Sequence, residues 1–282
     1  MRYCCPLSID EAVTILAADE NARCLAGGAT LVAMMNADLL KPSTLVSLRA
    51  ITALDGMRQS DTGFAIGAMT RHAAVASEPR LTHDLAVVRY AAQEIGHPAI
   101  RAVGTLGGSI AHADPSADYP TALVAARAEV ELVSSSGTRR VPASEFFQDF
   151  FTTSLEQGEM ITSVHLPTAD PASGSSYLKV ARSDGDFAIV SMAFCGSFEG
   201  SICSSARVAI GGCASTPINV PEIDEILVGA ELGSPEVTTA AQALADACDP
   251  IDDVRGSADY RRLLVKRLLP RVLDRALCAA NK

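Results

Sequence analysis

Two glycine-rich segments are the part of this sequence best suited to bind a ligand. Residues 26–31 read Ala-Gly-Gly-Ala-Thr-Leu, and residues 101–109 read Arg-Ala-Val-Gly-Thr-Leu-Gly-Gly-Ser. Glycine allows positive φ angles and close approach of a ligand, so successive backbone N–H groups in such a turn can point at one anion. Two loops of this kind could hold a single diphosphate from both sides.

The glycine spacing excludes two common phosphate-binding motifs. Neither segment has the G-x-G-x-x-G pattern of the dinucleotide-binding Rossmann turn, and neither continues into Gly-Lys-Ser/Thr as a P-loop does. A single Gly-Gly pair is most often an ordinary turn, so the prediction depends on the two segments together. Few cations stand nearby, Arg23, Lys41 and Arg101, so we expect amides to meet most of the diphosphate charge.

Composition limits the class of protein. The chain has 282 residues, 48% of them hydrophobic, which is enough for a large core and for two domains. Its net charge of −10 and its lack of a long Lys/Arg run argue against nucleic acid or an anionic membrane as the main partner. No apolar run reaches the length of a membrane span, and Asp10 and Glu11 come before any signal-peptide core could form. We therefore expect a cytoplasmic protein.

The eight cysteines indicate neither a metal site nor a disulfide framework. They show no Cys-x-x-Cys spacing, and no histidine stands near them in a ligand pattern. We interpret them as buried free thiols of a cytosolic core. The residues are Cys4, Cys5, Cys24, Cys195, Cys203, Cys213, Cys248 and Cys278.

The first part of the chain predicts a βαβ-like start. A short strand near residues 2–6 is followed by Ser8 and Glu11, which have the spacing of a capping box at a helix start. We expect a helix from Ile9 to Ala18, a strand over residues 23–26 that leads to the first glycine segment, and a strand over residues 44–48.

The middle of the chain alternates between strands and helices. We expect strands over residues 64–68, 128–133 and 160–166, the last one ending at Pro167. Helices are expected after Thr70 as the cap, over residues 84–95 and over residues 120–126. Phe146, Phe147, Phe150 and Phe151 stand three and four apart, which indicates a stripe in the core or at an interface.

A change in composition marks the expected domain boundary. Residues 168–176 are rich in Pro, Ala, Ser and Gly, and we place the division there. Beyond it, strands are expected over residues 177–181, 188–198 and 206–211. Helices are then expected to begin at Pro221, at Pro235 after a Ser234 cap, and at about Ala258, with a kink near Leu269 caused by Pro270. This order predicts a small antiparallel sheet backed by helices.

Short motifs in a fixed order cover the whole chain. They are Tyr3-x-x-Pro6-x-Ser8-x-x-Glu11-Ala12, Ala26-Gly27-Gly28-x-Thr30-Leu31, Ile66-Gly67-Ala68, Ile100-Arg101, Thr105-x-Gly107-Gly108, Pro115-x-x-Asp118, Tyr177-x-Lys179, and Arg207-Val208-Ala209-Ile210-Gly211-Gly212 with Thr216-Pro217. Together they resemble the FAD-binding medium subunit of molybdenum hydroxylases, the enzymes similar to carbon monoxide dehydrogenase and xanthine dehydrogenase.

The resemblance implies an α+β fold with two domains. Residues 1–172 would form a two-subdomain FAD-binding domain of the p-cresol methylhydroxylase superfamily type, divided near residue 55 into subdomains 1–55 and 56–172. Residues 173–282 would form a C-terminal flavoprotein domain of three-stranded antiparallel sheet plus helices. FAD would lie extended between the two subdomains.

The family's FAD contacts also carry over by resemblance. They fall on Ala26, Gly27, Gly28, Ala29, Thr30, Leu31, Thr105, Gly107, Gly108, Ser109, His112, Asp118, Ile161 and Lys179. Ala102 and Ser109 replace asparagines that are common in relatives, which removes side-chain contacts but no backbone donor. For His112 we favour a backbone-facing or ribityl contact over metal ligation or a covalent flavin link. The family pattern also predicts that Asp186 and Phe187 flank the isoalloxazine ring.

Two alternative readings concern single residues. Asp114 and Asp118 stand four apart like the acid pair of a hydrolase, but Pro115 interrupts the helix that would place them on one face. Lys179 has an alternative reading as an ordinary solvated residue of a strand.

The implied function is electron transfer by an FAD-dependent oxidoreductase subunit. In a molybdenum hydroxylase, molybdopterin on a large partner oxidises the substrate, and [2Fe-2S] clusters on a small partner pass electrons to non-covalent FAD on this chain. The resemblance also implies a dimer of heterotrimers, a heterohexamer. The acceptor stays open between NAD, oxygen, a quinone and a carrier protein, and the substrate is not encoded here. The alternatives are a stand-alone flavin oxidoreductase and a flavin-free scaffold subunit.

Overall fold

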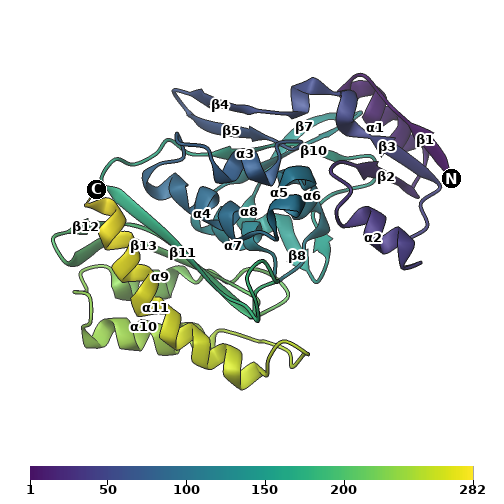
Figure 1. Ribbon diagram of the computed structural model, residues 1–282. Coiled ribbons are helices and arrows are strands. Elements are labelled where there is room, and N and C mark those ends of the chain that lie inside the picture. The colour runs from purple at the N-terminus through teal and green to yellow at the C-terminus, as the bar shows by residue number, and fades with distance from the viewer. Residues whose placement is uncertain (282) are drawn as a thin grey trace.

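The computed structural model describes residues 1–281, and its N-terminal unit is a small parallel sheet. The strands β1 (Arg2–Cys4), β2 (Ala22–Leu25) and β3 (Thr44–Ser47) pair in the order β1-β3-β2. Helix α1 (Ile9–Ala18) connects β1 to β2, and α2 (Leu31–Asn36) follows the first glycine segment. The βαβ-like start predicted from the sequence is confirmed. This unit forms the purple end of the molecule in Figure 1.

Local capping defines the start of α1. The Ser8 hydroxyl accepts a hydrogen bond from the N–H of Glu11 at 3.2 Å, as the capping box predicts. The Glu11 carboxylate in turn accepts a hydrogen bond from the N–H of Leu7 at 2.8 Å, not from the N–H of Ser8. Ala12, Val13 and Leu16 face inward, so one side of α1 covers the parallel sheet.

The second unit is a five-stranded antiparallel sheet covered by helices. Its strands are β4 (Met57–Ser60), β5 (Gly63–Gly67), β6 (Glu129–Ser134), β7 (Gly137–Pro142) and β10 (Met160–Leu166), in the order β4-β5-β10-β6-β7. Its helices are α3 (His72–Ala76), α4 (Ala86–Glu94), α5 (Pro98–Val103), α6 (Leu106–His112), α7 (Asp118–Ala125) and α8 (Ala143–Phe146). The short strands β8 (Phe147–Asp149) and β9 (Thr152–Thr153) form a separate ribbon. Figure 1 shows α3, α4 and α7 together on one side of the sheet.

Three local predictions in this unit are corrected. Thr70 does not cap α3, because Arg71 is the N-cap and the Thr70 hydroxyl donates to the Gly56 carbonyl at 3.0 Å. The helix expected from residue 84 begins as a 3-10 turn over His83–Leu85, before α4. The four phenylalanines do not form one stripe: Phe146 and Phe147 are buried, whereas Phe150 and Phe151 are exposed. The chain leaves the helix after Phe146, so helical spacing no longer applies.

The C-terminal unit is the predicted three-stranded antiparallel sheet with helices. Its strands β11 (Ser173–Val180), β12 (Val190–Glu199) and β13 (Ile202–Gly211) pair in sequence order. The helices are α9 (Pro221–Leu227), α10 (Pro235–Asp246) and α11 (Ala258–Ala280). Strand β11 starts inside the Pro/Ala/Ser/Gly-rich segment, earlier than predicted, and Ser234 precedes α10 without a side-chain capping bond. Helix α11, yellow in Figure 1, continues through Pro270; the kink near Leu269 stays a prediction.

Helix α7 joins the second unit to the third. All eight of its residues are buried, which is typical of a helix surrounded by other elements. It packs against α4 on one side and against β12 and β13 on the other. The Thr121 and Ser191 hydroxyls form a hydrogen bond across this junction at 3.1 Å, in a fully buried position.

The cysteine prediction is correct only in part. All eight thiols are free, and Cys195, Cys203, Cys213 and Cys248 are buried, but Cys5 and Cys278 are exposed, with Cys4 and Cys24 half-buried. Within residues 1–281, no helix is both long and apolar enough to cross a membrane.

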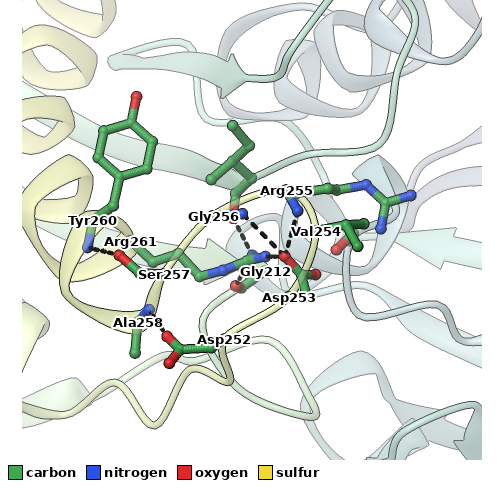
Figure 2. Close-up of polar contacts among 12 residues, drawn as sticks. Gly212, Asp252, Asp253, Val254, Arg255, Gly256, Ser257, Ala258, Tyr260 and Arg261 are labelled. Atoms are coloured by element: carbon green, nitrogen blue, oxygen red, sulfur yellow. Dashed lines mark hydrogen bonds and ion pairs between the residues drawn. The ribbon is translucent and has the colours of Figure 1, made fainter.

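A buried arginine holds the loop before α11 against the C-terminal sheet. Arg261 is 2% exposed, and its guanidinium donates to the carbonyls of Ile189 and Gly212 and, at 2.6 Å, to the Asp253 carboxylate. Figure 2 shows this side chain reaching from α11 into the turn formed by the residues after Asp252. The Asp253 carboxylate also accepts from the N–H of Arg255 at 2.8 Å. One cation therefore satisfies groups from three separate segments.

We expect Arg261→Met to lower the free energy of unfolding by about 2–4 kcal/mol, because two buried carbonyls and one carboxylate lose their donor. Urea denaturation of the purified chain measures this change. Arg271→Met is the matched control, since Arg271 lies exposed on the same helix. Equal stability of the two variants would contradict the role of the buried network.

Candidate functional site

The two glycine segments lie in direct backbone contact. A Cβ atom placed on Gly27 would lie 1.9 Å from the carbonyl oxygen of Val103 and 3.0 Å from the Cα of Gly104. Gly28 has a φ of 77°, the left-handed region that favours glycine. The first segment leaves β2 and the second precedes α6, so the contact joins the N-terminal unit to the helices of the second unit. The proximity predicted from the sequence is present in the structure.

The first segment offers a row of backbone donors. Among the described residues, the N–H groups of residues 27–31 have no intramolecular hydrogen-bond partner. Backbone N–H groups require a partner when they are not in water, so these donors can bind an anionic ligand. The contact of these amides with a diphosphate stays a prediction.

The second segment differs from its prediction of many free amides. It is the start of α6, with Thr105 as the N-cap. The N–H of Leu106 donates to the Thr70 carbonyl at 3.0 Å, that of Gly107 to the Ala68 carbonyl at 2.8 Å, and that of Gly108 to the Thr105 hydroxyl at 3.2 Å. These amides therefore stabilise the fold. What this segment can offer a ligand is the N–H of Thr105 and the hydroxyls of Thr105 and Ser109.

Gly107 is required for packing. A Cβ atom on this residue would lie 2.6 Å from the Cβ of Ala68, so only glycine lets α6 approach the end of β5 this closely. The carbonyl of Thr162 in β10 accepts from the N–H of Ala68 at 2.9 Å, which continues the same chain of contacts. Ile161, the neighbouring position, is buried at a β-bulge of β10. Ile161 thus lies on β10, the strand that pairs with β5, and β5 ends where α6 begins.

The cations near the glycine segments are already bound to protein groups. Arg23 donates to the carbonyls of Glu20 and Ala22, and Lys41 pairs with Asp38 at 3.1 Å. Arg101 donates to the carbonyls of Ile95 and Gly96 at 2.9 and 2.7 Å. The arrangement favours recognition of an anion by neutral amides.

Sequence reasoning missed a buried histidine beneath this site. His72 is 4% exposed, its ring lies 5.4 Å from that of Tyr119, and its Nε2 lies 2.6 Å from the place of a Cβ on Gly104. Burial, and secondarily the charge of Arg101, lowers the pKa of His72 to about 4. It is therefore a neutral support for the turn between α5 and α6. A lone histidine carries no spacing signal that could have identified it.

His112 lies at the last position of α6 and is half-buried. Its ring is 5.2 Å from that of Phe151, and the N–H of Phe151 donates to the Ala113 carbonyl at 3.2 Å. Burial lowers the pKa of His112, which favours the neutral ring. Residues 1–281 contain no group of three or more His, Cys, Asp or Glu side chains arranged to hold a metal ion.

A buried ion pair joins Asp118 to Lys179. Their side chains are 7% and 3% exposed, and Lys179 Nζ lies 3.1 Å from an Asp118 carboxylate oxygen. The Tyr177 hydroxyl donates to the same carboxylate at 2.7 Å, and Lys179 also donates to the Glu94 carbonyl at 2.6 Å. The reading of Lys179 as a solvated residue is therefore wrong. Burial raises the pKa of Asp118, while the Lys179 charge acts in the opposite direction.

The acid-pair reading is not supported by the structure. The Asp114 carboxylate accepts from the N–H of Ser116 at 2.8 Å within its own turn, whereas Asp118 faces Lys179. The two carboxylates thus have separate partners.

Contacts connect the glycine segments to the ion pair. Gly104 follows α5, Arg101 of α5 binds the Gly96 carbonyl, and Glu94, two residues before Gly96, binds Lys179. The loop after β11 also contacts the turn between α4 and α5, since a Cβ on Gly185 would lie 2.9 Å from the Gly96 carbonyl. Free amides at one position and a buried charged pair further along suit an extended ligand with an anionic centre. This arrangement fits the class of protein that the sequence predicts, one that holds a dinucleotide without a Rossmann turn.

Comparison with known proteins identifies the family. Residues 1–169 match the family described as the FAD binding domain in molybdopterin dehydrogenase, and residues 175–276 match the CO dehydrogenase flavoprotein C-terminal domain. The 6-hydroxypseudooxynicotine dehydrogenase complex subunit alpha of Paenarthrobacter nicotinovorans is 36% identical over 97% of this chain and 93% of its own length. The carbon monoxide dehydrogenase medium chain of Afipia carboxidovorans is 36% identical over 98% of this chain and 96% of its own.

A solved structure agrees. A chain of the reconstituted CO dehydrogenase from Oligotropha carboxidovorans superposes with a TM-score of 0.95 at 34% identity, over 99% of this chain and 98% of that one. The protein therefore belongs to the FAD-binding medium subunits of molybdenum hydroxylases, and it is the FAD-binding subunit of an FAD-dependent oxidoreductase.

We expect Gly27→Ala to reduce the amount of FAD that the purified chain retains, because the added Cβ would overlap the Val103 carbonyl and separate the two segments. Flavin absorbance per chain after gel filtration measures the loss. Gly229→Ala is the control: a Cβ there meets no atom within 4 Å, and because Gly229, unlike Gly27, has a positive φ of 82°, this variant adds backbone strain without an overlap. Full FAD retention by Gly27→Ala would show that the close contact is not needed for the site.

We expect Lys179→Met to destabilise the chain by about 3–5 kcal/mol at neutral pH, because Asp118 is left as an uncompensated buried charge. Without Lys179 the folded-state pKa of Asp118 rises further above its unfolded value. The folded state then binds the proton more tightly, so the loss of stability shrinks as pH falls and grows as pH rises. Urea denaturation between pH 5 and 8 measures this trend.

The double variant Asp118→Asn/Lys179→Met is the control for this experiment. Removal of both charges should recover most of the stability and abolish the additional pH dependence. A Lys179→Met loss that is the same at every pH would rule out the buried carboxylate as its cause.

Proposed function

We propose that this chain holds one FAD non-covalently, with the diphosphate at the backbone N–H groups of residues 27–31 and at the hydroxyls of Thr105 and Ser109. The observation that carries the proposal is the contact of Gly27 with the Val103 carbonyl, beside a row of unpartnered amides. The remaining FAD contacts expected from the resemblance are Ala26, Gly107, Gly108, His112, Asp118, Ile161 and Lys179.

The chain's own residues bind and orient the cofactor, and they take no part in covalent chemistry. FAD, when bound, supplies the exchange between one-electron and two-electron carriers. The neutral His72 and the buried pair of Asp118 and Lys179 provide fixed, water-excluded groups around the proposed path of the cofactor. In this proposal no side chain is a nucleophile or a general base.

The proposed partners are a small subunit with [2Fe-2S] clusters and a large subunit with molybdopterin, arranged as a dimer of heterotrimers. Electrons would pass from the clusters to this chain and then to an external acceptor. The names of the relatives support a complex of several subunits, since one is a complex subunit and another a medium chain. A cytoplasmic location stays a prediction from the sequence.

Substrate specificity is proposed to lie outside this chain. The chain is equally similar, at 36% identity, to subunits of a dehydrogenase for a nicotine derivative and of carbon monoxide dehydrogenase. Two relatives whose names point to such different substrates share one medium-subunit architecture. This supports an electron-transfer role over a stand-alone oxidoreductase that binds its own substrate.

The domain division proposed from the sequence is 1–172, with subdomains near 1–55 and 56–172, and 173–282. The two matched families leave a gap between residues 169 and 175, which supports a division there.

The test is an absorption spectrum of the purified chain after incubation with FAD or FMN and removal of free flavin. We expect about one FAD per chain and no retained FMN, because FMN lacks the diphosphate that the amide row would bind. The chain has no tryptophan, so the flavin bands are a better probe than intrinsic fluorescence. No FAD on the chain isolated from its native complex would favour the scaffold alternative.

A further inference from the structure

A cleft of about 720 Å³ lies at the end of the five-stranded sheet away from the glycine segments. The glycine segments contact the ends of β5 and β10 near Ala68 and Thr162, whereas the cleft is lined by Phe64 and Leu166 at the opposite ends of the same strands. The volume is within the usual range of small-molecule sites, and the cleft lies where the second and third units meet, a common position for such sites. It is thus separate from the proposed FAD site.

Four arginines, three from strands and one from a connecting segment, line this cleft. Arg58 belongs to β4, Arg140 to β7 and Arg207 to β13, while Arg127 lies between α7 and β6. Arg140 pairs with Glu131 at 3.2 Å. In the described part of the chain, the other three form neither an ion pair nor a side-chain hydrogen bond. Arg58 and Arg127 are exposed and Arg207 is half-buried, so their donors are accessible to a ligand in the cleft.

The cleft is positively charged, whereas the whole protein is negatively charged. The chain carries a net charge of −10, yet the cleft lining has four arginines and a single carboxylate, Glu129. Like charges gathered in a concave site repel one another. Glu131 pairs with Arg140 and the charge of Arg127 acts on the buried Asp224, but within residues 1–281 Arg58 and Arg207 have no carboxylate partner. A polyanionic ligand would compensate these charges.

Arginine also indicates the kind of anion. Its planar guanidinium presents paired donors that match a phosphate, and several arginines are needed where more than one phosphate is bound. Phe64, Val124 and Leu166 also line the cleft, and because they are buried they form its floor. We propose that this cleft binds a small molecule carrying a diphosphate group, at a second site distinct from the one for FAD.

The test titrates inorganic pyrophosphate, and separately ADP, into the full chain already loaded with FAD, by calorimetry and with the flavin spectrum recorded throughout. We expect saturable one-to-one binding with no release of flavin. Arg58→Gln and Arg207→Gln should each weaken binding by about tenfold or more, since each removes a charge-assisted contact. Arg271→Gln, on the exposed side of α11, should bind as the unmodified chain does.

Neither of these two arginines has a structural partner to lose, so both variants should keep the unfolding temperature and the FAD content of the unmodified chain. Tighter binding of ADP than of pyrophosphate would identify a nucleotide as the ligand class, and equal binding would identify the diphosphate group alone. The proposal is overturned by absence of saturable binding at millimolar pyrophosphate, by equal affinity in the variants, or by release of FAD during the titration. Because FAD retention is measured separately, failure here leaves the proposed function intact.

Discussion

The close contact between Gly27 and the Val103 carbonyl is the constraint on which the site depends. It brings together a turn of the parallel sheet and the start of a helix from the second unit, and any side chain at Gly27 would prevent it. Because the turn is held by this contact and not by hydrogen bonds of its own amides, the N–H groups of residues 27–31 stay available. The same packing that joins two units of the fold thus creates the donors for a ligand.

A second constraint lies at the junction of the second and third units. Asp118 begins the fully buried helix α7, and its partner Lys179 comes from the first strand of the C-terminal sheet. Buried ion pairs add little net stability compared with apolar packing, but they penalise any arrangement that separates the charges. With Tyr177 and the Glu94 carbonyl satisfying the remaining lone pairs and protons, the pair specifies one position of the sheet relative to α7.

The sequence predicts best what local chemistry decides. The Ser8 cap, the first-turn prolines of α9 and α10 and the alternating strand β10 all follow from residues within a few positions of one another. The roles of the other site residues depend on partners that are distant in sequence. The sequence predicts a free phosphate-binding amide at Gly107, but in the structure this N–H donates to the Ala68 carbonyl. Neither the support by His72 nor the placement of Arg58 and Arg207 in one cleft has a local signal in the sequence. The glycine segments could therefore be located from sequence, but their separate roles could not.

The two ends of the five-stranded sheet differ in the physics of anion recognition. At the glycine end, neutral amides meet an anion at short range and the neighbouring cations are already bound to carbonyls or to Asp38. Interactions with such dipoles depend little on ionic strength. At the other end, Arg58, Arg127 and Arg207 carry full charges in an open cleft, so their attraction is long-ranged and screened by salt. The first arrangement suits a cofactor that stays bound, and the second suits a ligand that exchanges with solution, because charged groups steer association and weaken as salt rises.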